Sequence, residues 1–341
     1  MKKEFLKKCL TLSMAAVLGT AVLAGCGSSD SQKSDSDTQD QSSDEDSTSK
    51  GTEGSYKVGV FQYTQHGALD EANKGFVDAL EASGLDCKID QQNASGDSNA
   101  TLTIAQKMVD DKNDLIFTIA TPASQAVAGL TTDIPIVLTA VTDPAEADLV
   151  ESNEEPGGNV TGTSDMNPVD KQVDLLKELI PDAKNVAVLY CSAEANSKLQ
   201  AELVAEVCEK VGITTTDYTV ANSGEIQTVV ESMVGKVDAI YAPTDNVIAN
   251  AMSTVAMIAN ENKIPVICGE ENMVEAGGLA TYSIDYYKLG QKAGEMAVKI
   301  LKGEAEPATM PIEYLEDSDL KLVVNQETAD TLGIDVSGLE Q

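Results

Sequence analysis

The sequence predicts an α/β protein with two similar lobes, each built around a parallel sheet. Short apolar strands recur at matching places in the two halves of the chain. The matching pairs are residues 57–61 with 185–189, 114–117 with 238–241, and 134–137 with 264–267. The three separations are nearly equal, which indicates one architecture used twice.

Amphipathic segments with helical spacing lie between these strands. One apolar stripe runs over residues 68–80 and ends before Gly84, and another runs over residues 199–211 and ends at Gly212. Short apolar strands that alternate with helices are typical of βαβ units with a buried parallel sheet. Right-handed crossovers place the carboxyl ends of all parallel strands at one edge, where open α/β sheets bind ligands. Two such sheets that face each other would enclose a cleft between the lobes.

The first 54 residues predict an export signal followed by a tether. Lysines precede an apolar stretch at residues 9–23, which is shorter than the roughly 20 residues that span a bilayer. The stretch ends in Leu-Ala-Gly-Cys and resembles a lipobox, which implies cleavage after residue 25 and acylation of Cys26, palmitate included. The alternative is an uncleaved helix that contains a cysteine. Residues 26–54 are rich in Ser and Asp, so we expect a disordered acidic tether there.

Composition narrows the class of partner. The formal net charge of −33 argues against nucleic acid, whose phosphates require clusters of Lys and Arg. The cysteines beyond Cys26 are Cys87, Cys191, Cys208 and Cys268. They show no C-x-x-C spacing and His66 is the one histidine, so we expect free buried thiols and neither a metal nor another cofactor. A disulfide remains the alternative in an exported protein.

The same composition argues against an enzyme. A single histidine leaves only His66 for a Ser-His-Asp or Cys-His arrangement. The nucleophile-elbow, zincin and P-loop motifs are absent from the sequence. Glu270 and Glu271 form a carboxylate pair, but adjacent residues in a turn give no sign of unlike environments.

Polar residues follow the predicted strands of the first half and are candidates for ligand binding. They are Gln65, Thr121, Ser124, Thr142, Ser164 and Asp165. Thr121 and the following proline predict a helix start, whose free backbone N–H groups suit a carboxylate. The alternative for Thr121 is an ordinary capped helix. Ser164 and Asp165 fall where the first lobe should pass into the second.

The second half offers a matching set after its own strands. The candidates are Glu194, Asn196, Ser197, Thr244, Asp245 and Asn246. Asp245 mirrors Thr121 and is the predicted partner of a cationic group, with helix capping as the alternative. Neutral donors in one lobe and a carboxylate in the other would suit a zwitterion.

Six motifs in a fixed order resemble those of a known family. They are residues 66–70 (HGALD), 119–126 (IATPASQA), 140–144 (AVTDP), 159–165 (NVTGTSD), 194–197 (EANS) and 243–246 (PTDN). They are similar to motifs of the ABC transporter substrate-binding lipoproteins of the tryptophan and aromatic amino-acid type. The resemblance extends over residues 56–334.

The resemblance implies a type I periplasmic-binding fold with two Rossmann-like lobes that close on ligand like a Venus flytrap. It implies crossovers near residues 165, 284 and 310. One lobe would then hold residues 55–165 and 285–309, and the other residues 166–284 and 310–341.

The resemblance also implies an extracytoplasmic protein, anchored to the membrane, that delivers ligand to a permease driven by an ATPase. An aromatic amino acid is the leading ligand. The alternatives are a purine, nucleoside or sugar, a sensor that presents its ligand to a membrane receptor, and, more distantly, a hydrolase.

Overall fold

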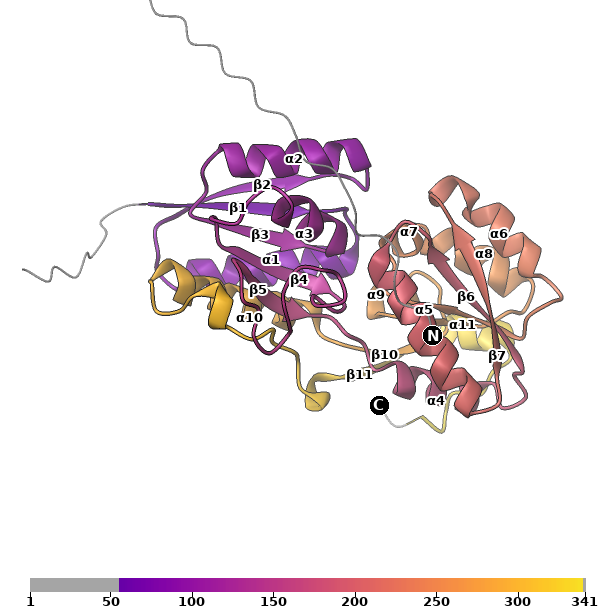
Figure 1. The fold of residues 1–341 in the computed structure, drawn as a ribbon. Helices are drawn as coiled ribbons and strands as arrows, with labels where there is room; N and C mark the ends of the chain where they lie inside the picture. Colours follow the sequence, from indigo (N-terminus) through magenta and orange to yellow (C-terminus); the bar gives the residue numbers. More distant parts are fainter. Residues whose placement is uncertain (1–54, 340–341) are drawn as a thin grey trace, which may run out of the picture. The chain divides into compact units, whose positions relative to one another are not determined.

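The computed structural model describes residues 55–339, which belong to one compact unit (Figure 1). The predicted signal peptide, tether and Cys26 lie outside the described residues. Over the described range, every helix is too short or too polar to cross a membrane.

The first lobe contains a five-stranded, fully parallel sheet in the order β2-β1-β3-β4-β5. Its strands are β1 (Tyr56–Gln62), β2 (Cys87–Asn93), β3 (Leu115–Ile119), β4 (Ile136–Val141) and β5 (Val160–Ser164). Its helices are α1 (Gly67–Ala82), α2 (Ser98–Asp110), α3 (Thr121–Ala128) and α10 (Tyr286–Leu301). Strands β3 and β4 are buried throughout because helices cover both faces of the sheet.

The second lobe contains a six-stranded sheet in the order β11-β10-β9-β8-β6-β7, parallel except for the edge strand β11. Its strands are β6 (Asn185–Cys191), β7 (Thr214–Val220), β8 (Ala239–Ala242), β9 (Val266–Cys268), β10 (Ala280–Ser283) and β11 (Lys321–Val324). Its helices are α4 (Val169–Leu179), α5 (Ala195–Lys210), α6 (Ile226–Met233), α7 (Asn246–Asn250), α8 (Met252–Glu261), α9 (Glu271–Glu275) and α11 (Gln326–Leu332). The prediction of two α/β lobes with parallel sheets is confirmed.

The chain passes between the lobes after β5, after β10 and before β11. Helix α10 returns to the first lobe and packs along α1, as Figure 1 shows. Residues up to Glu313 stay on the first lobe, because Glu313 accepts from the Ser164 N–H and donates its own N–H to Gly162. The third passage therefore begins a few residues after the expected crossover near residue 310.

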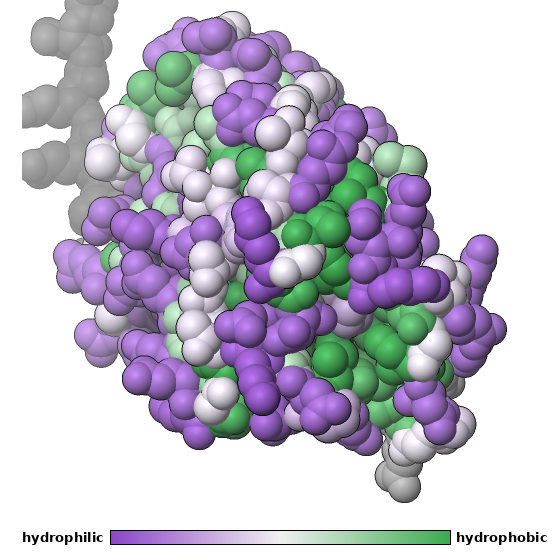
Figure 2. All heavy atoms as spheres, turned by 90° about the vertical axis from the view of Figure 1, so that its right-hand side faces the viewer, coloured by the Kyte–Doolittle hydropathy of each residue, from purple (hydrophilic) through white to green (hydrophobic). Residues whose placement is uncertain are grey.

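The surface of the second lobe is mostly hydrophilic on the face that Figure 2 shows. The cysteines Cys191, Cys208 and Cys268 are buried and free, and Cys87 is partly buried and free. A polar face fits the strongly acidic composition, and the buried thiols belong to the packing of the sheets.

Candidate functional site

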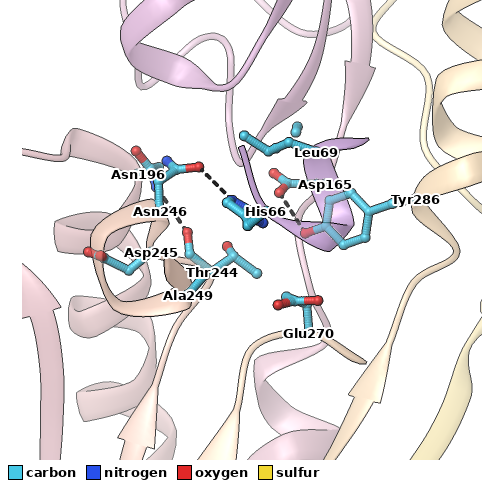
Figure 3. Close-up of a pocket in the computed structure, with 11 residues that line it drawn as sticks. His66, Leu69, Asp165, Asn196, Thr244, Asp245, Asn246, Ala249, Glu270 and Tyr286 are labelled. Carbon is cyan, nitrogen blue, oxygen red and sulfur yellow. Dashed lines mark hydrogen bonds between the residues drawn. The ribbon is translucent and has the colours of Figure 1, made fainter. Parts of the chain in front are cut away.

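A small cavity lies between the lobes, where the carboxyl ends of both sheets meet. Residues of the first lobe, of the second lobe and of the first passage between them surround it (Figure 3). They are His66, Leu69, Ala140, Asp165, Asn196, Thr244, Asp245, Asn246, Ala249, Glu270 and Tyr286. Five of the predicted residues, Asp165, Asn196, Thr244, Asp245 and Asn246, are among them.

A second small cavity shares Asn196 with the first. Thr121 contributes to its wall, together with Ala195 and Leu199 from α5. The Thr121 hydroxyl is buried and finds no hydrogen-bond partner among the described residues. The predicted helix start at Thr121 is therefore brought to the same part of the interlobe space as Asn196.

Strained backbone occurs where β3 and β4 end, beside these two cavities. Ala120 has φ 80° and Ala140 has φ 53°, both in the left-handed region that favours glycine. Ala140 sits at an irregularity in the β4–β5 pairing and lines the first cavity. Strain of this kind is frequent at functional sites, where the surrounding fold holds it in place.

Asp165, like Glu194, is a buried carboxylate with one oxygen that has no partner among the described residues, and of the two only Asp165 lines the cavity. The Tyr286 hydroxyl donates to its Oδ2 at 2.9 Å, whereas Oδ1 has no partner among the described residues. The side chain is 4% exposed. Burial raises the pKa of Asp165 to about 6, because the low-dielectric surroundings disfavour the charged form.

Asp245 caps helix α7, as the alternative interpretation of the sequence had it. The Cys191 N–H donates to Oδ2 at 2.6 Å and the Ile248 N–H donates to Oδ1 at 2.8 Å. In Figure 3 the carboxylate points away from His66 and Asp165. Burial raises the pKa of Asp245. Both oxygens are already used by backbone donors, so the structure disfavours Asp245 as the partner of a cationic ligand group.

Glu194 lies beneath the cavity wall and is 2% exposed. Its Oε2 accepts from the Asn246 N–H at 3.2 Å, from Asn246 Nδ2 at 2.5 Å and from Asn196 Nδ2 at 3.4 Å. Burial, and then the neighbouring Asp245 carboxylate, raise the pKa of Glu194. Glu194 thus holds two residues that line the cavity without lining it itself.

The remaining predicted residues do not line either cavity. The exposed Gln65 contacts Asp70 at 3.4 Å, and the Ser124 hydroxyl bonds Thr118 inside the first lobe at 2.9 Å. The Ser164 hydroxyl donates to the Thr142 carbonyl at 2.7 Å. Ser197 is buried and accepts from Asn196 Nδ2 at 3.3 Å.

Three polar lining residues of the first cavity were not predicted as ligand contacts. Glu270 is buried, caps α9 and accepts from the Asn272 and Met273 N–H groups. Burial raises its pKa to about 7. Glu270 follows β9 closely, so the expectation that polar residues after parallel strands bind ligand could have identified it. His66 precedes α1, and the sequence indicated it only as a candidate for catalysis. Tyr286 begins a helix after a passage between the lobes, where the expectation about residues that follow parallel strands gives no signal.

Three hydrogen bonds join the lobes around the cavity. His66 Nε2 lies 3.2 Å from Asn246 Oδ1. Asn250 Nδ2 donates to the Thr64 hydroxyl at 2.8 Å, and Gln200 Nε2 donates to the Thr142 hydroxyl at 2.9 Å. The described arrangement is therefore one in which the lobes touch and enclose the site.

The charged side chains that line the two cavities are acidic. Carboxylates line both cavities, whereas no lysine or arginine belongs to either lining as far as the chain is described. His66 does not supply a positive charge, because burial lowers its pKa. The described residues also contain no cluster of three or more His, Cys, Asp or Glu that could hold a metal ion.

Comparisons with known proteins give consistent matches over the described residues. A family model described as ABC transporter substrate binding protein matches residues 57–338. A tyrosine-binding protein of Clostridioides difficile (strain R20291) is 42% identical over 330 residues, which is 96% of this chain and 92% of that protein.

Two solved structures are similar over 84% of this chain and 97% of their own. One, from Streptococcus pneumonia, is an ABC domain in complex with L-Trp, with 41% identity and a TM-score of 0.81. The other is the ligand-free, open structure of a substrate binding protein with adhesive properties from Clostridium difficile, with 45% identity and a TM-score of 0.65.

Proposed function

Because this chain belongs to the family of ABC transporter substrate binding proteins, we propose that its interlobe cavity captures an α-amino acid, in the first place an aromatic one. Its two α/β lobes have the architecture of the type I periplasmic-binding fold. The observation that carries the proposal is a buried carboxylate with an unused oxygen, Asp165, in a cavity lined from both lobes.

Asp165 is the proposed partner of the ligand ammonium group. Its Oδ1 is buried and has no hydrogen-bond partner among the described residues, so an ammonium would supply a hydrogen bond and the missing charge. Tyr286 holds the other oxygen and thereby fixes the orientation of the carboxylate. Asp165 replaces Asp245 in this role.

The ligand carboxylate is proposed to bind at the start of α3. Thr121 offers a buried hydroxyl with no partner among the described atoms, and the first turn of α3 offers backbone N–H groups. Such donors suit a carboxylate in a site without lysine or arginine.

An aromatic side chain is supported by the relatives and by the cavity wall. The relative from Clostridioides difficile is named a tyrosine-binding protein, and the solved structure from Streptococcus pneumonia is a complex with L-Trp. The wall includes apolar surface from Leu69, Ala140 and Ala249 and the ring of Tyr286.

Closure of the lobes on the ligand is supported by the two structural relatives. The chain agrees better with the L-Trp complex than with the open, ligand-free structure, although its identity to the latter is higher. The hydrogen bonds His66–Asn246, Thr64–Asn250 and Thr142–Gln200 would form only when the lobes meet. This fits a hinge motion of two rigid lobes.

Substrate binding proteins of this family work outside the cytoplasm. We propose that Cys26 carries acyl chains that anchor the protein to the membrane, and that closed protein delivers its amino acid to an ABC permease and its ATPase. Replacing Cys26 by Ala should release the exported protein from the membrane fraction into the soluble fraction. Retention of the Cys26→Ala protein in the membrane would contradict the anchor.

The ligand assignment is tested by mass spectrometry of small molecules released from gently purified, denatured protein, followed by calorimetry. L-tyrosine and L-tryptophan should bind with micromolar or tighter affinity, which corresponds to a binding free energy of about −8 kcal/mol or a more negative value. Adenosine and glucose serve as controls. Binding of a nucleoside or sugar without any amino acid would overturn the proposal.

A further inference from the structure

Three buried acceptor atoms around the first cavity lack a partner among the described residues. They are Oδ1 of Asp165, Oδ1 of Asn196 and Nδ1 of His66. All three residues line the cavity, and they come from the first passage, from α5 and from the segment before α1. A primary ammonium carries three N–H donors and can therefore satisfy more than one such acceptor.

Glu194 sets the orientation of the Asn246 amide, whereas the Thr244 carbonyl, which accepts from Asn196 Nδ2 at 3.1 Å, sets that of the Asn196 amide. The backbone N–H of Asn246 donates to Glu194 Oε2, which identifies this oxygen as an acceptor. The side-chain atoms of Asn246 and Asn196 that face it must therefore be the amide nitrogens. The carbonyl oxygens of both amides consequently point away from Glu194.

The oriented amide of Asn246 in turn sets the tautomer of His66. Asn246 Oδ1 can only accept, so the facing Nε2 of His66 must carry the hydrogen (Figure 3). Burial lowers the pKa of His66, which keeps the ring neutral. Nδ1 is then left with a free lone pair and acts as an acceptor.

We infer that Glu194 is a positioning residue that, through Asn246 and His66, turns the Nδ1 acceptor of His66 toward the cavity that Asp165 also lines, so that the site selects primary over N-methylated amines. This inference rests on the proposed capture of an amino acid. An N-methylated ligand has one donor fewer and must place a methyl group against an acceptor. A buried acceptor left without a donor weakens binding substantially.

The test compares L-tyrosine with N-methyl-L-tyrosine by calorimetry on the whole exported protein. The wild type should bind N-methyl-L-tyrosine about ten- to a hundredfold more weakly. In Glu194→Leu the Asn246 amide loses the acceptor that orients it, so L-tyrosine affinity should fall, and the ratio of the two affinities should shrink about tenfold. Glu194→Gln keeps one acceptor for Asn246, so its ratio of L-tyrosine to N-methyl-L-tyrosine affinity should stay close to that of the wild type. A purely structural role of Glu194 would change affinity for both ligands alike and leave the ratio in place.

A second pair of variants covers the case in which Glu194→Leu does not fold. His66 makes no side-chain capping bond to α1 and is only partly buried as a whole residue, so its substitution should not unfold the lobe. His66→Gln places its amide near the Nε2 position and removes the Nδ1 acceptor, so the ratio should fall. His66→Asn keeps an oxygen near the Nδ1 position and should retain a larger ratio than His66→Gln.

The outcomes separate the two proposals. Equal affinity of the wild type for L-tyrosine and N-methyl-L-tyrosine overturns the selection of primary amines and leaves amino-acid capture standing. An unchanged ratio in both Glu194→Leu and His66→Gln overturns the positioning role. Binding of neither ligand overturns the proposed function itself.

Discussion

Asp165 combines burial, one satisfied oxygen and one free oxygen, and each of these has a measurable consequence. Asp165→Asn keeps an acceptor for the Tyr286 hydroxyl but removes the charge that would attract an ammonium. Hydrogen bonds to charged groups contribute about 1.5–3 kcal/mol, so L-tyrosine affinity should fall about ten- to a hundredfold in calorimetry.

The matched control for this variant is Asp245→Asn, because Asp245 uses its oxygens for the Cys191 and Ile248 N–H groups. Asp245→Asn should lower the melting temperature of the ligand-free protein, whereas Asp165→Asn should not. Loss of affinity in Asp245→Asn at unchanged stability, with Asp165→Asn behaving as wild type, would return the ammonium site to Asp245.

The raised pKa of Asp165 predicts how stability changes with pH. Burial raises this pKa from 3.8 to about 6, so between these values the folded protein keeps a proton that the unfolded chain has released. With the lobes closed as described, the free energy of unfolding should therefore decrease as the pH rises from about 4 to about 6. The contribution of this single group is on the order of 3 kcal/mol.

This pH effect is measured as the difference between wild type and Asp165→Asn in denaturant titrations from pH 4 to pH 7.5. The difference isolates Asp165 from the other carboxylates, among them Glu270, whose pKa burial raises to about 7. The wild type should lose stability relative to the variant as the pH rises. A constant difference over this range would show that Asp165 is not buried as described.

The sequence predicted part of the site because polar residues after parallel strands meet at one edge of a sheet. That rule found Asp165, Asn196 and Thr121. It could not separate a ligand contact from a cap, since the role of Asp245 is decided by the Cys191 N–H, far away in sequence. Glu194 likewise reaches the cavity only through the amides that it holds.

At the scale of elements, the packing of α1 against α10 depends on glycines. A Cβ atom at Gly290 would collide with the backbone carbonyl of Ala72, and one at Gly75 would collide with the carbonyl of Tyr287. The two helices therefore touch through their backbones. This close approach ties α10, which arrives from the second lobe, to the first lobe.

Gly290→Ala should destabilise the protein by about 1–3 kcal/mol in denaturant unfolding, because a backbone carbonyl cannot move aside like the end of a side chain. Gly158→Ala is the control, since a Cβ there meets nothing within 4 Å. Equal stability of the two variants would contradict the described contact between α1 and α10.

Elements with buried apolar runs were predicted, and elements without them were not. The central strands β1, β3, β6 and β8 correspond to the repeated apolar segments. The edge strands β2 and β7 are polar at many positions because one side of each is exposed, so no run marks them. The placement of α10 and the final strand came from the family resemblance, because the partner of a terminal element depends on tertiary contacts that periodicity does not encode.

At the scale of the whole molecule, the family resemblance is confirmed by the family match, and the two-lobed architecture follows from it. A small number of contacts between rigid lobes then controls ligand binding. Asn250 is useful for measuring this control because it is exposed and its amide crosses to Thr64 on the other lobe. It lines neither cavity, so its effect on affinity can only be indirect.

Asn250→Ala should weaken L-tyrosine binding about two- to tenfold, mainly through faster dissociation, because the lost hydrogen bond contributes about 0.5–1.5 kcal/mol to the closed arrangement. The melting temperature of the ligand-free protein should stay unchanged, since the lobes separate without ligand and Asn250 then faces solvent. Small-angle scattering should show the wild type becoming more compact on adding L-tyrosine, and Asn250→Ala should need more ligand to reach the same compactness. If the lobes are instead fixed together, scattering will not respond to ligand, and Asn250→Ala will lower the ligand-free melting temperature while leaving the dissociation rate as it was.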